Sequence, residues 1–288
     1  MLLGIPFGRD KNTGEWKDVA EVTRGLDCNC VCPSCKLPLS ARHGDEREWH
    51  FAHHTRNISK EDIVDCEFSF QVSLRMMIHQ LFIDGLALKV PGYNQHITVP
   101  RQLNNSIDSI VTITGERLIN TREVNYSIDS IFLGQQVDVI FNFGTATLIV
   151  YLSYRGREFP FSKRLLKNAK AGALIFDLEK LTQIFYRKPF TDEDQLGTAR
   201  TQLLGWLKSS IEAKSWYYHP REDKLIDDRN NEIDEALRNK KSATNHFTIP
   251  AHKLSKCKCL GCGHTFTGYK NMANSCPNCK THLYVSNF

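Results

Sequence analysis

The spacing of hydrophobic positions changes along the chain. Around residue 70 it follows the period of a helix, with apolar side chains at Phe70, Leu74, Met77, Ile78, Leu81 and Phe82. Gly85 follows as a residue suited to end that helix. Runs typical of strands come next, at residues 86–90, 96–99, 109–113, 124–132, 136–141 and 147–154. This order predicts one helix followed by antiparallel strands.

The second half of the chain alternates helical and strand patterns. Residues 161–172 predict a helix closed by Gly172, and residues 173–178 predict a buried strand. Residues 191–214 predict a further helix, because acids occupy its first turn. Residues 219–246 are polar with mixed charge, which indicates a linker or an exposed helix. The whole order of elements is typical of an α/β core.

The composition is that of a globular protein, since 41% of the 288 residues are hydrophobic and 24% are charged. The longest apolar run, residues 146–152, is too short to span a bilayer. No basic segment precedes the short apolar patch at the start, so we expect no signal peptide. A soluble, cytoplasmic protein without membrane contact is therefore expected.

The ten cysteines form one cluster near each end of the chain. In a chain without an export signal, paired CxxC spacing favours metal binding over disulfides. The C-terminal pairs supply the four soft ligands of a zinc ribbon: Cys259, Cys262, Cys276 and Cys279. A segment this short has little core, so it needs the ion to fold. The ribbon fits a brace, a docking site for a protein partner or a DNA contact, and Cys257 has no assigned role.

A second zinc site is predicted where a CPSC segment precedes an HFAH segment. Its expected ligands are Cys32, Cys35, His50 and His53. A closed shell of four ligands leaves no position for substrate, so we expect two structural zinc ions in all. The neighbours with open roles are Cys28, Cys30, His43 and His54. The chain then divides into a zinc-binding module (1–60), a core (61–220), a charged linker (221–250) and the zinc ribbon (251–288).

Basic residues gather in two places. Residues 251–288 hold five lysines and no acid, which accounts for the whole net charge of +5. A four-thiolate zinc site would offset about two of these charges, so nucleic-acid contact is permitted rather than required. A second strip follows residue 154 and comprises Arg155, Arg157, Lys163, Arg164, Lys167 and Lys170. It predicts either a solvated helix face or a ridge that contacts phosphates.

The segment CPSCKLPLSARHGDEREWHFAHH resembles the N-terminal zinc segment of the competence protein CoiA-like family. The likeness continues through a helix with Glu67, Gln71 and Arg75 on one face, a strand with Asp138, the basic helix and the WYYHPR segment (216–221). The core of that family resembles the PD-(D/E)XK nuclease fold. The resemblance therefore implies a nuclease-like α/β core flanked by two small zinc modules.

What the resemblance implies chemically is phosphodiester hydrolysis with Mg²⁺, held by carboxylate oxygens of Glu67 and Asp138 while Lys163 steers the phosphate. The family also has an acid on the next strand, but residues 149–151 are Ile, Val and Tyr. The remaining acids that could substitute are Glu123, Asp129 and Glu158. Glu67 also suits a helix N-terminus without any metal, whereas a buried Asp138 would need a partner.

Three functions fit this sequence. One is a Mg²⁺-dependent nuclease that acts on incoming or foreign DNA, in transformation or in defence against mobile elements, as the resemblance implies. Another is a catalytically inactive nuclease-fold protein that serves as a DNA-binding or adaptor platform. A third is a zinc protein that binds a protein partner and has no DNA role. The distance from Asp138 to other carboxylates distinguishes the first function from the second.

Overall fold

The computed structural model describes residues 4–44, 49–55, 66, 69–100, 106–186, 198–244, 254–270, 273–280 and 285–287. Contacts within the chain define two units, Met1–Arg229 and Asn230–Phe288. The predicted four-part division remains a prediction. Among the described helices, none combines the length and the apolar character needed to cross a membrane.

The first unit is built on a five-stranded mixed sheet with the order β10-β11-β12-β13-β14. The strands are β10 (Asn125–Phe132), β11 (Gln135–Phe143), β12 (Ala146–Ser153), β13 (Ala171–Asp177) and β14 (Lys214–Tyr218). The first three form an antiparallel meander, β13 runs parallel to β12, and β14 is antiparallel to β13. A parallel neighbour requires a crossover, and α2 (Lys163–Asn168) lies within it.

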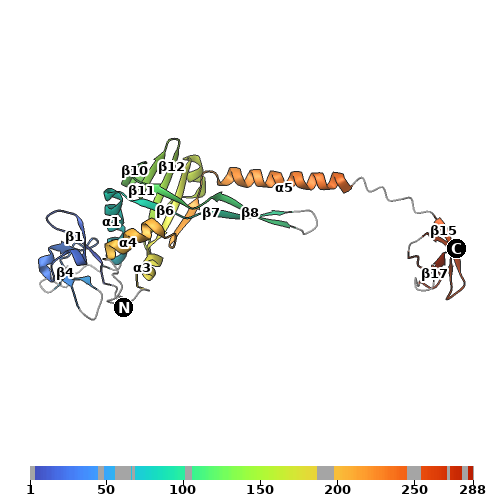
Figure 1. Cartoon of the computed structure of the whole chain (residues 1–288), viewed down its shortest axis with the longest axis horizontal. Coiled ribbons are helices and arrows are strands. Elements are labelled where there is room, and N and C mark those ends of the chain that lie inside the picture. Colours follow the sequence, from blue (N-terminus) through green and yellow to red (C-terminus); the bar gives the residue numbers. More distant parts are fainter. Residues whose placement is uncertain are drawn as a thin grey trace. The chain divides into compact units, whose positions relative to one another are not determined.

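Helices cover both faces of this sheet (Figure 1). On one face, side chains such as Val139, Val150 and Leu174 pack with α1 (Ser69–Asp84), α3 (Leu178–Tyr186) and α4 (Ala199–Ser209). On the opposite face, side chains that include Ile149, Ala173 and Tyr218 pack with Leu166 of α2. Burial on both faces explains the nearly continuous apolar runs of the central strands.

Helix α1 confirms the helix predicted near residue 70. Its predicted apolar positions are all buried: Phe70, Leu74, Met77, Ile78, Leu81 and Phe82. Gly85 ends the helix in a left-handed conformation with φ of 84°, and its N–H bonds the carbonyl of Phe82 at 3.1 Å. This conformation favours glycine because it lacks a Cβ.

The helix predicted over residues 161–172 is shorter, and its predicted cap is wrong. Helix α2 ends at Asn168, and Gly172 lies inside β13. Strand β13 begins at Ala171 because it pairs there with Thr147 of β12. A Cβ on Gly172 would lie 3.2 Å from Pro220 Cδ, so glycine serves close packing at this position. Helix α3 was not predicted, and the helix predicted over 191–214 is α4 within the described residues.

Several predicted strands form small separate sheets. Residues 86–90, 96–99 and 109–113 contribute to the pairs β6 (Ala87–Val90) with β9 (Arg117–Asn120) and β7 (Tyr93–Pro100) with β8 (Ser106–Thr114). The N-terminal part has the sheet β2-β1-β3 and the pair β4-β5. Their bounds are β1 (Phe7–Asp10), β2 (Trp16–Asp18), β3 (Cys30–Val31), β4 (Leu39–Arg42) and β5 (His50–His53), with short 3₁₀ helices η1 (Val19–Glu21) and η2 (Leu26–Cys28).

The charged segment after β14 is helical, as α5 (Glu222–Thr244). The boundary between the two units falls within this helix, after Arg229. The second unit contains a three-stranded antiparallel sheet with the order β16-β15-β17. Its strands are β15 (Leu254–Cys259), β16 (Thr265–Tyr269) and β17 (Val285–Asn287). Along β15, exposed Lys256 and Lys258 alternate with buried Cys257 and Cys259, as the period of a strand requires.

Candidate functional site

Asp138 lies where strands β11 and β12 stop pairing. The last pair of their ladder is Val139↔Val150, and Asp138 is the next residue along β11. Its Oδ2 accepts the backbone N–H of Leu152 at 2.7 Å, so a side chain satisfies a backbone donor at the end of the ladder. The residue has an exposed fraction of 0%. A charge buried this deeply requires partners.

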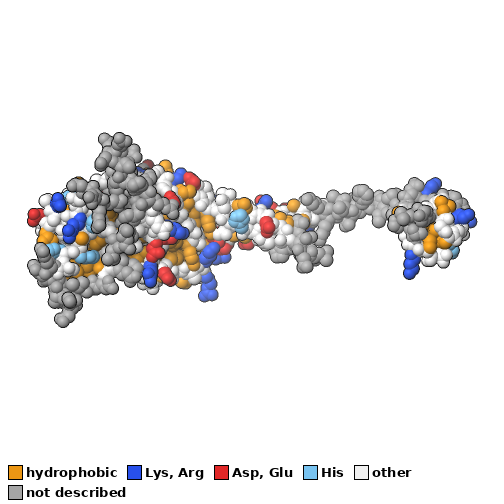
Figure 2. Space-filling model, turned by 90° about the horizontal axis from the view of Figure 1, so that it is seen from below, with side chains coloured by type: hydrophobic (Ala, Val, Ile, Leu, Met, Phe, Trp, Pro, Cys, Tyr) orange, Lys and Arg blue, Asp and Glu red, His pale blue; other side chains and the backbone are white. Residues whose placement is uncertain are grey.

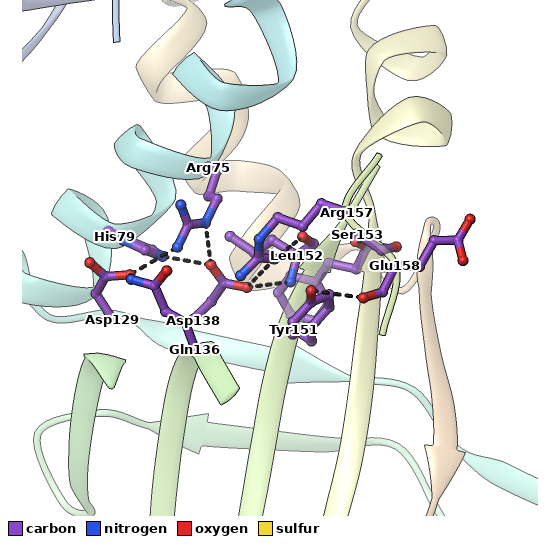
Figure 3. A network of polar contacts seen from close by, with 11 residues as sticks. Arg75, His79, Asp129, Gln136, Asp138, Tyr151, Leu152, Ser153, Arg157 and Glu158 are labelled. Carbon is purple, nitrogen blue, oxygen red and sulfur yellow. Dashed lines mark hydrogen bonds and ion pairs between the residues drawn. The ribbon is translucent and has the colours of Figure 1, made fainter. Parts of the chain in front are cut away.

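The side chains of two arginines and one histidine surround this carboxylate (Figure 3). Arg75 Nε and His79 Nε2 lie 2.5 Å and 3.0 Å from Asp138 Oδ1. Both belong to α1, where a separation of four residues places them on one face. Arg157 Nη1 approaches from beyond β12 and lies 2.8 Å from Asp138 Oδ2. The Arg157 guanidinium also lies over the ring of Tyr151, 4.0 Å from its centroid.

These partners hold Asp138 as an anion. Burial by itself would raise its pKa, but the hydrogen bond from His79 and the charges of Arg75 and Arg157 outweigh burial and lower the pKa to about 2. A carboxylate has roughly four acceptor positions. Four donors already reach it, from Arg75, His79, Leu152 and Arg157. All of its acceptor positions are therefore used in hydrogen bonds within the protein.

Other carboxylates do not join Asp138 to make a magnesium site. Asp129 Oδ1 instead accepts Arg75 Nη2 at 2.9 Å and Gln136 Nε2 at 2.8 Å. Glu158 contributes only its backbone carbonyl, and its side chain points away from Asp138 in Figure 3. Among the described residues, no cluster of three or more His, Cys, Asp or Glu includes Asp138. The Mg²⁺ expected from the resemblance is not supported.

Of the other two predicted catalytic residues, only Lys163 is among the described residues, and it pairs with Glu222 rather than with Asp138. Glu67 lies outside the described residues. Lys163, at the start of α2, has its Nζ 2.9 Å from Glu222 Oε1. Glu123, a candidate substitute acid, accepts a hydrogen bond from Asn120 Nδ2 at 2.7 Å in the turn after β9.

Three members of the predicted basic strip form ion pairs with acids of the fold. Arg157 pairs with Asp138, Lys163 with Glu222, and Lys167 with Asp223, where the Nζ–Oδ2 distance is 2.9 Å. The remaining members are exposed: Arg155, Arg164 and Lys170. Since the first acids of α5 face the lysines of α2, this surface is closer to charge balance than the sequence alone indicates.

The N-terminal module gathers four candidate metal ligands, Cys32, Cys35, His53 and Cys66, whose ligand atoms all lie within 4.8 Å of one another. Cys32 Sγ is 3.5 Å from Cys66 Sγ, and Cys35 Sγ is 3.3 Å from His53 Nε2. Tetrahedral zinc with bonds of about 2.0–2.3 Å separates its ligand atoms by roughly 3.3–3.8 Å. The donor set and these distances are therefore compatible with structural zinc.

His50, a predicted ligand, is outside this group. His50 and His53 are three residues apart on β5, and side chains at odd separations point to opposite faces of a strand. His50 instead packs on Gly4, where an added Cβ would lie 2.4 Å from His50 Cβ. Cys66 completes the group from the segment before α1, where its carbonyl accepts the Ser69 N–H at 3.4 Å. Cys28 and Cys30 are buried but also lie outside the group.

The second unit brings together the four predicted ribbon ligands, Cys259, Cys262, Cys276 and Cys279. Cys259 Sγ is 3.5 Å from Cys279 Sγ, and Cys262 Sγ is 3.6 Å from Cys276 Sγ. These separations also fit tetrahedral zinc. Cys257 is buried on β15 and is not part of the group.

The three CxxC turns share one backbone geometry. The residue after the second cysteine has a positive φ: 63° at Lys36, 74° at Gly263 and 54° at Lys280. Its N–H bonds the carbonyl of the first cysteine, at 3.1, 2.8 and 2.8 Å respectively. The same local turn therefore presents paired thiols in both modules, which strengthens the assignment of both groups as metal sites.

Sequence reasoning assigned no role in these sites to Cys66 or His79, and it named Arg75 only as a member of the helix face with Glu67 and Gln71. Cys66 stands alone in the sequence, so pairing by short spacing does not find it, although its position in the front cysteine cluster is a signal. Arg75 and His79 share a helix face at a spacing of four residues. Basic residues on one helix face, together with a single acid in an apolar strand, indicate a structural ion pair as well as they indicate a catalytic site.

Comparison with known protein families matches the N-terminal part of the chain. Residues 17–60 match the family described as competence protein CoiA, N-terminal domain. No curated protein and no solved structure matches the chain. The matched range contains three of the four candidate ligands of the first metal group, Cys32, Cys35 and His53. The N-terminal zinc-type segment is thus similar to the N-terminal domain of the competence protein CoiA.

Proposed function

We propose that this chain is a DNA-binding protein whose nuclease-like core does not hydrolyse DNA, and that it acts on incoming DNA in a competence-related role. The observation that carries the proposal is the saturated hydrogen bonding of the Asp138 carboxylate. All four of its acceptor positions face donors of the protein, which leaves none for a metal ion. The similarity of residues 17–60 to the CoiA N-terminal domain supports the competence-related part.

The order of elements supports a nuclease-like core. Helix α1 precedes the meander β10–β11–β12, and α2 then crosses over to β13, which is parallel to β12. Asp138 lies on the middle strand of the meander, and α1 supplies two of its partners. This is the order in which the resembling family places a helix with a functional side chain, a strand with an aspartate, a further strand and a basic helix.

The charges around Asp138 argue against metal-dependent hydrolysis. A divalent cation at this carboxylate would have to displace Arg75 and Arg157, which lie within ion-pair distance of it. It would also gain no second acid from β12, where Ile149, Val150 and Tyr151 are uncharged. Magnesium requires several oxygen ligands in octahedral geometry. The network is therefore better suited to holding α1 against the sheet.

The exposed face of the ribbon sheet supports nucleic-acid binding. Lys256 and Lys258 lie on the face of β15 opposite to Cys257 and Cys259. Their exposed neighbours are Leu254 on β15 and Thr265, Thr267 and Tyr269 on β16, which pair with them across the ladder. Tyr269 has an exposed fraction of 51%. An exposed aromatic ring on the same sheet face as two cations is a combination with which proteins stack bases and contact phosphates.

Charge within the ribbon is one-sided. Residues 251–288 contain five lysines and neither Asp nor Glu. On the face seen in Figure 2, the C-terminal module carries blue lysine side chains and orange apolar ones, and no red acidic ones. Because this surface has no acidic side chain of its own to neutralise the lysines, attraction to the phosphate backbone should be long-ranged and sensitive to salt.

The test uses the purified, zinc-loaded full chain. Single-stranded and double-stranded DNA of the same sequence are incubated with the protein and Mg²⁺ or Mn²⁺, and cleavage is followed on denaturing gels. Binding is measured in parallel by fluorescence anisotropy at several salt concentrations. We expect no cleavage above the buffer control and salt-sensitive binding.

Two results would overturn parts of this proposal. Cleavage that depends on the added metal and is lost in Asp138→Asn would restore the nuclease. Absence of DNA binding at low salt by a folded, zinc-loaded chain would remove the DNA role and leave a protein-binding zinc module. The Asp129→Asn variant is the matched control. It removes a neighbouring carboxylate that also accepts a hydrogen bond from Arg75 but is not the buried acid of β11.

A further inference from the structure

A cavity of about 430 Å³ lies at the opposite end of β11 and β12 from Asp138. Phe143, the last residue of β11, and Thr147, near the start of β12, help to line it, whereas Asp138 is near the start of β11. This volume is within the range of small-molecule sites in proteins. The cavity is thus separate from the site already described.

Two arginines and a histidine converge on this cavity. Arg117 comes from β9, and His219 and Arg221 come from the segment between β14 and α5. Arg221 Nη2 donates to the carbonyl of Ile113 at 3.0 Å, which orients its guanidinium. Burial, followed by the charges of Arg221 and Arg117, lowers the pKa of His219 to about 4. The cavity therefore has a positive local potential, with Glu123 as an acid in its lining.

On the apolar side of the cavity, Trp216 is held by several contacts. The indole Nε1 donates to the carbonyl of Pro91 at 2.8 Å, and the ring is 5.0 Å from that of His219 in an edge arrangement. Gly172 allows this packing, because a Cβ there would lie 3.4 Å from the Trp216 ring and 3.2 Å from Pro220. The bond to Pro91, which lies outside the lining, fixes Trp216, and His219 and Pro220 pack beside Trp216 and Gly172 within the lining.

We propose that this cavity binds a nucleoside phosphate, with the phosphate at Arg117 and Arg221 and the base against Trp216 and Phe143. Two arginines line this cavity, and guanidinium groups suit a phosphate because their planar donors match its oxygens. An apolar lining with an aromatic ring suits a flat base. The proposal goes beyond DNA binding by the ribbon, and it gives the WYYHPR segment (216–221) a binding role.

The same chemistry is available in two sources, a free nucleotide or the terminal nucleotide of a DNA strand. Isothermal titration calorimetry of the zinc-loaded full chain with nucleoside monophosphates, the matching nucleosides and inorganic phosphate tests the chemistry. Oligonucleotides with a 5′-phosphate or a 5′-hydroxyl then distinguish the sources. A 5′-phosphorylated strand that competes more strongly than the monophosphate identifies a strand end, and the reverse order identifies a free nucleotide.

Arg117→Gln and Arg221→Gln should each weaken monophosphate binding by about tenfold or more. Arg122→Gln is the matched control, an exposed arginine of the same region that does not line this cavity, and it should leave binding unchanged. Lys256→Ala with Lys258→Ala should also leave it unchanged, which separates this site from DNA binding by the ribbon. Absence of monophosphate binding, binding unaffected in both arginine variants, or equal affinity for inorganic phosphate would overturn the proposal.

Discussion

Arg75 Nε lies 2.5 Å from Asp138 Oδ1, and this contact joins α1 to β11 across 63 positions of the chain. Because Asp138 is fully buried, its charge depends on these partners. We expect Asp138→Asn to lower the free energy of unfolding at neutral pH by about 3 kcal/mol, since it leaves buried guanidiniums without their anion. Urea denaturation followed by circular dichroism measures the change.

The matched control is Asp129→Asn. The Asp129 side chain is 47% exposed and also contacts Arg75. Its replacement should cost less than about 1 kcal/mol, because an exposed ion pair is screened by solvent. Equal stability of Asp138→Asn and the unmodified chain would contradict a structural role for the buried network.

The same carboxylate predicts a pH dependence. The folded-state pKa of Asp138 is about 2, below its ordinary value of 3.8. A lowered folded-state pKa means that the stabilisation is complete above about pH 4 and is lost as the pH falls towards 2. The stability difference between the unmodified chain and Asp138→Asn should therefore shrink by about 2 kcal/mol over this interval. Denaturation of both proteins at matched pH values measures it, and acid release of zinc affects both alike.

The metal group of the first unit predicts opposite results for two ligand-type residues. Cys66→Ser should reduce bound zinc from two ions per chain to one, because Cys66 belongs to one of the two candidate metal groups. His50→Gln should retain both ions, because His50 lies outside that group. Inductively coupled plasma mass spectrometry after gel filtration gives the ratio. Loss of an ion in His50→Gln together with full occupancy in Cys66→Ser would contradict the ligand set.

The ribbon lysines predict a change in the salt dependence of DNA binding. The association constant K for DNA falls as salt rises, so the slope of log K against log salt is negative. Replacing both Lys256 and Lys258 with alanine should reduce the magnitude of this slope by about two, since each lysine that contacts a phosphate contributes roughly one. Anisotropy titrations at several salt concentrations measure the slope. Lys11→Ala combined with Lys208→Ala, two exposed lysines of the first unit, should leave the slope unchanged. An unchanged slope in the ribbon variant would contradict the prediction and would mean that another surface contacts the phosphates.

The buried Lys214 predicts a large effect on stability. Its Nζ lies 3.1, 2.9 and 2.7 Å from the carbonyl oxygens of Trp206, Leu207 and Ser210 at the end of α4. Lys214→Met removes the Nζ donor from all three carbonyls, although the Trp206 carbonyl keeps the Ser210 N–H at 3.1 Å. Unfolding should therefore become easier by about 2 kcal/mol. Urea denaturation tests this expectation. Lys208→Met, on the exposed side of α4, should change stability by less than about 0.5 kcal/mol.

Local features were predictable because their signals lie within one turn or one strand. The apolar spacing that begins at Phe70 predicts α1, and Gly85 ends it. The CxxC spacing predicts the ribbon ligands, since a single tight turn presents both thiols. Helix α3 was missed because its nine residues directly follow a buried strand, which leaves little room for a separate helical period to be recognised.

Tertiary packing decided the rest. The residues around Asp138 come from a helix 63 positions earlier and from a segment 19 positions later. Similarly, Cys66 replaces His50 because alternation along β5 turns one histidine away from the metal group. The sequence by itself determined α1, most strands of the central sheet, the cysteine pairs and the isolated acid on β11. Only the tertiary structure decided which side chains satisfy that acid, because the partners of a buried charge depend on which elements pack around it.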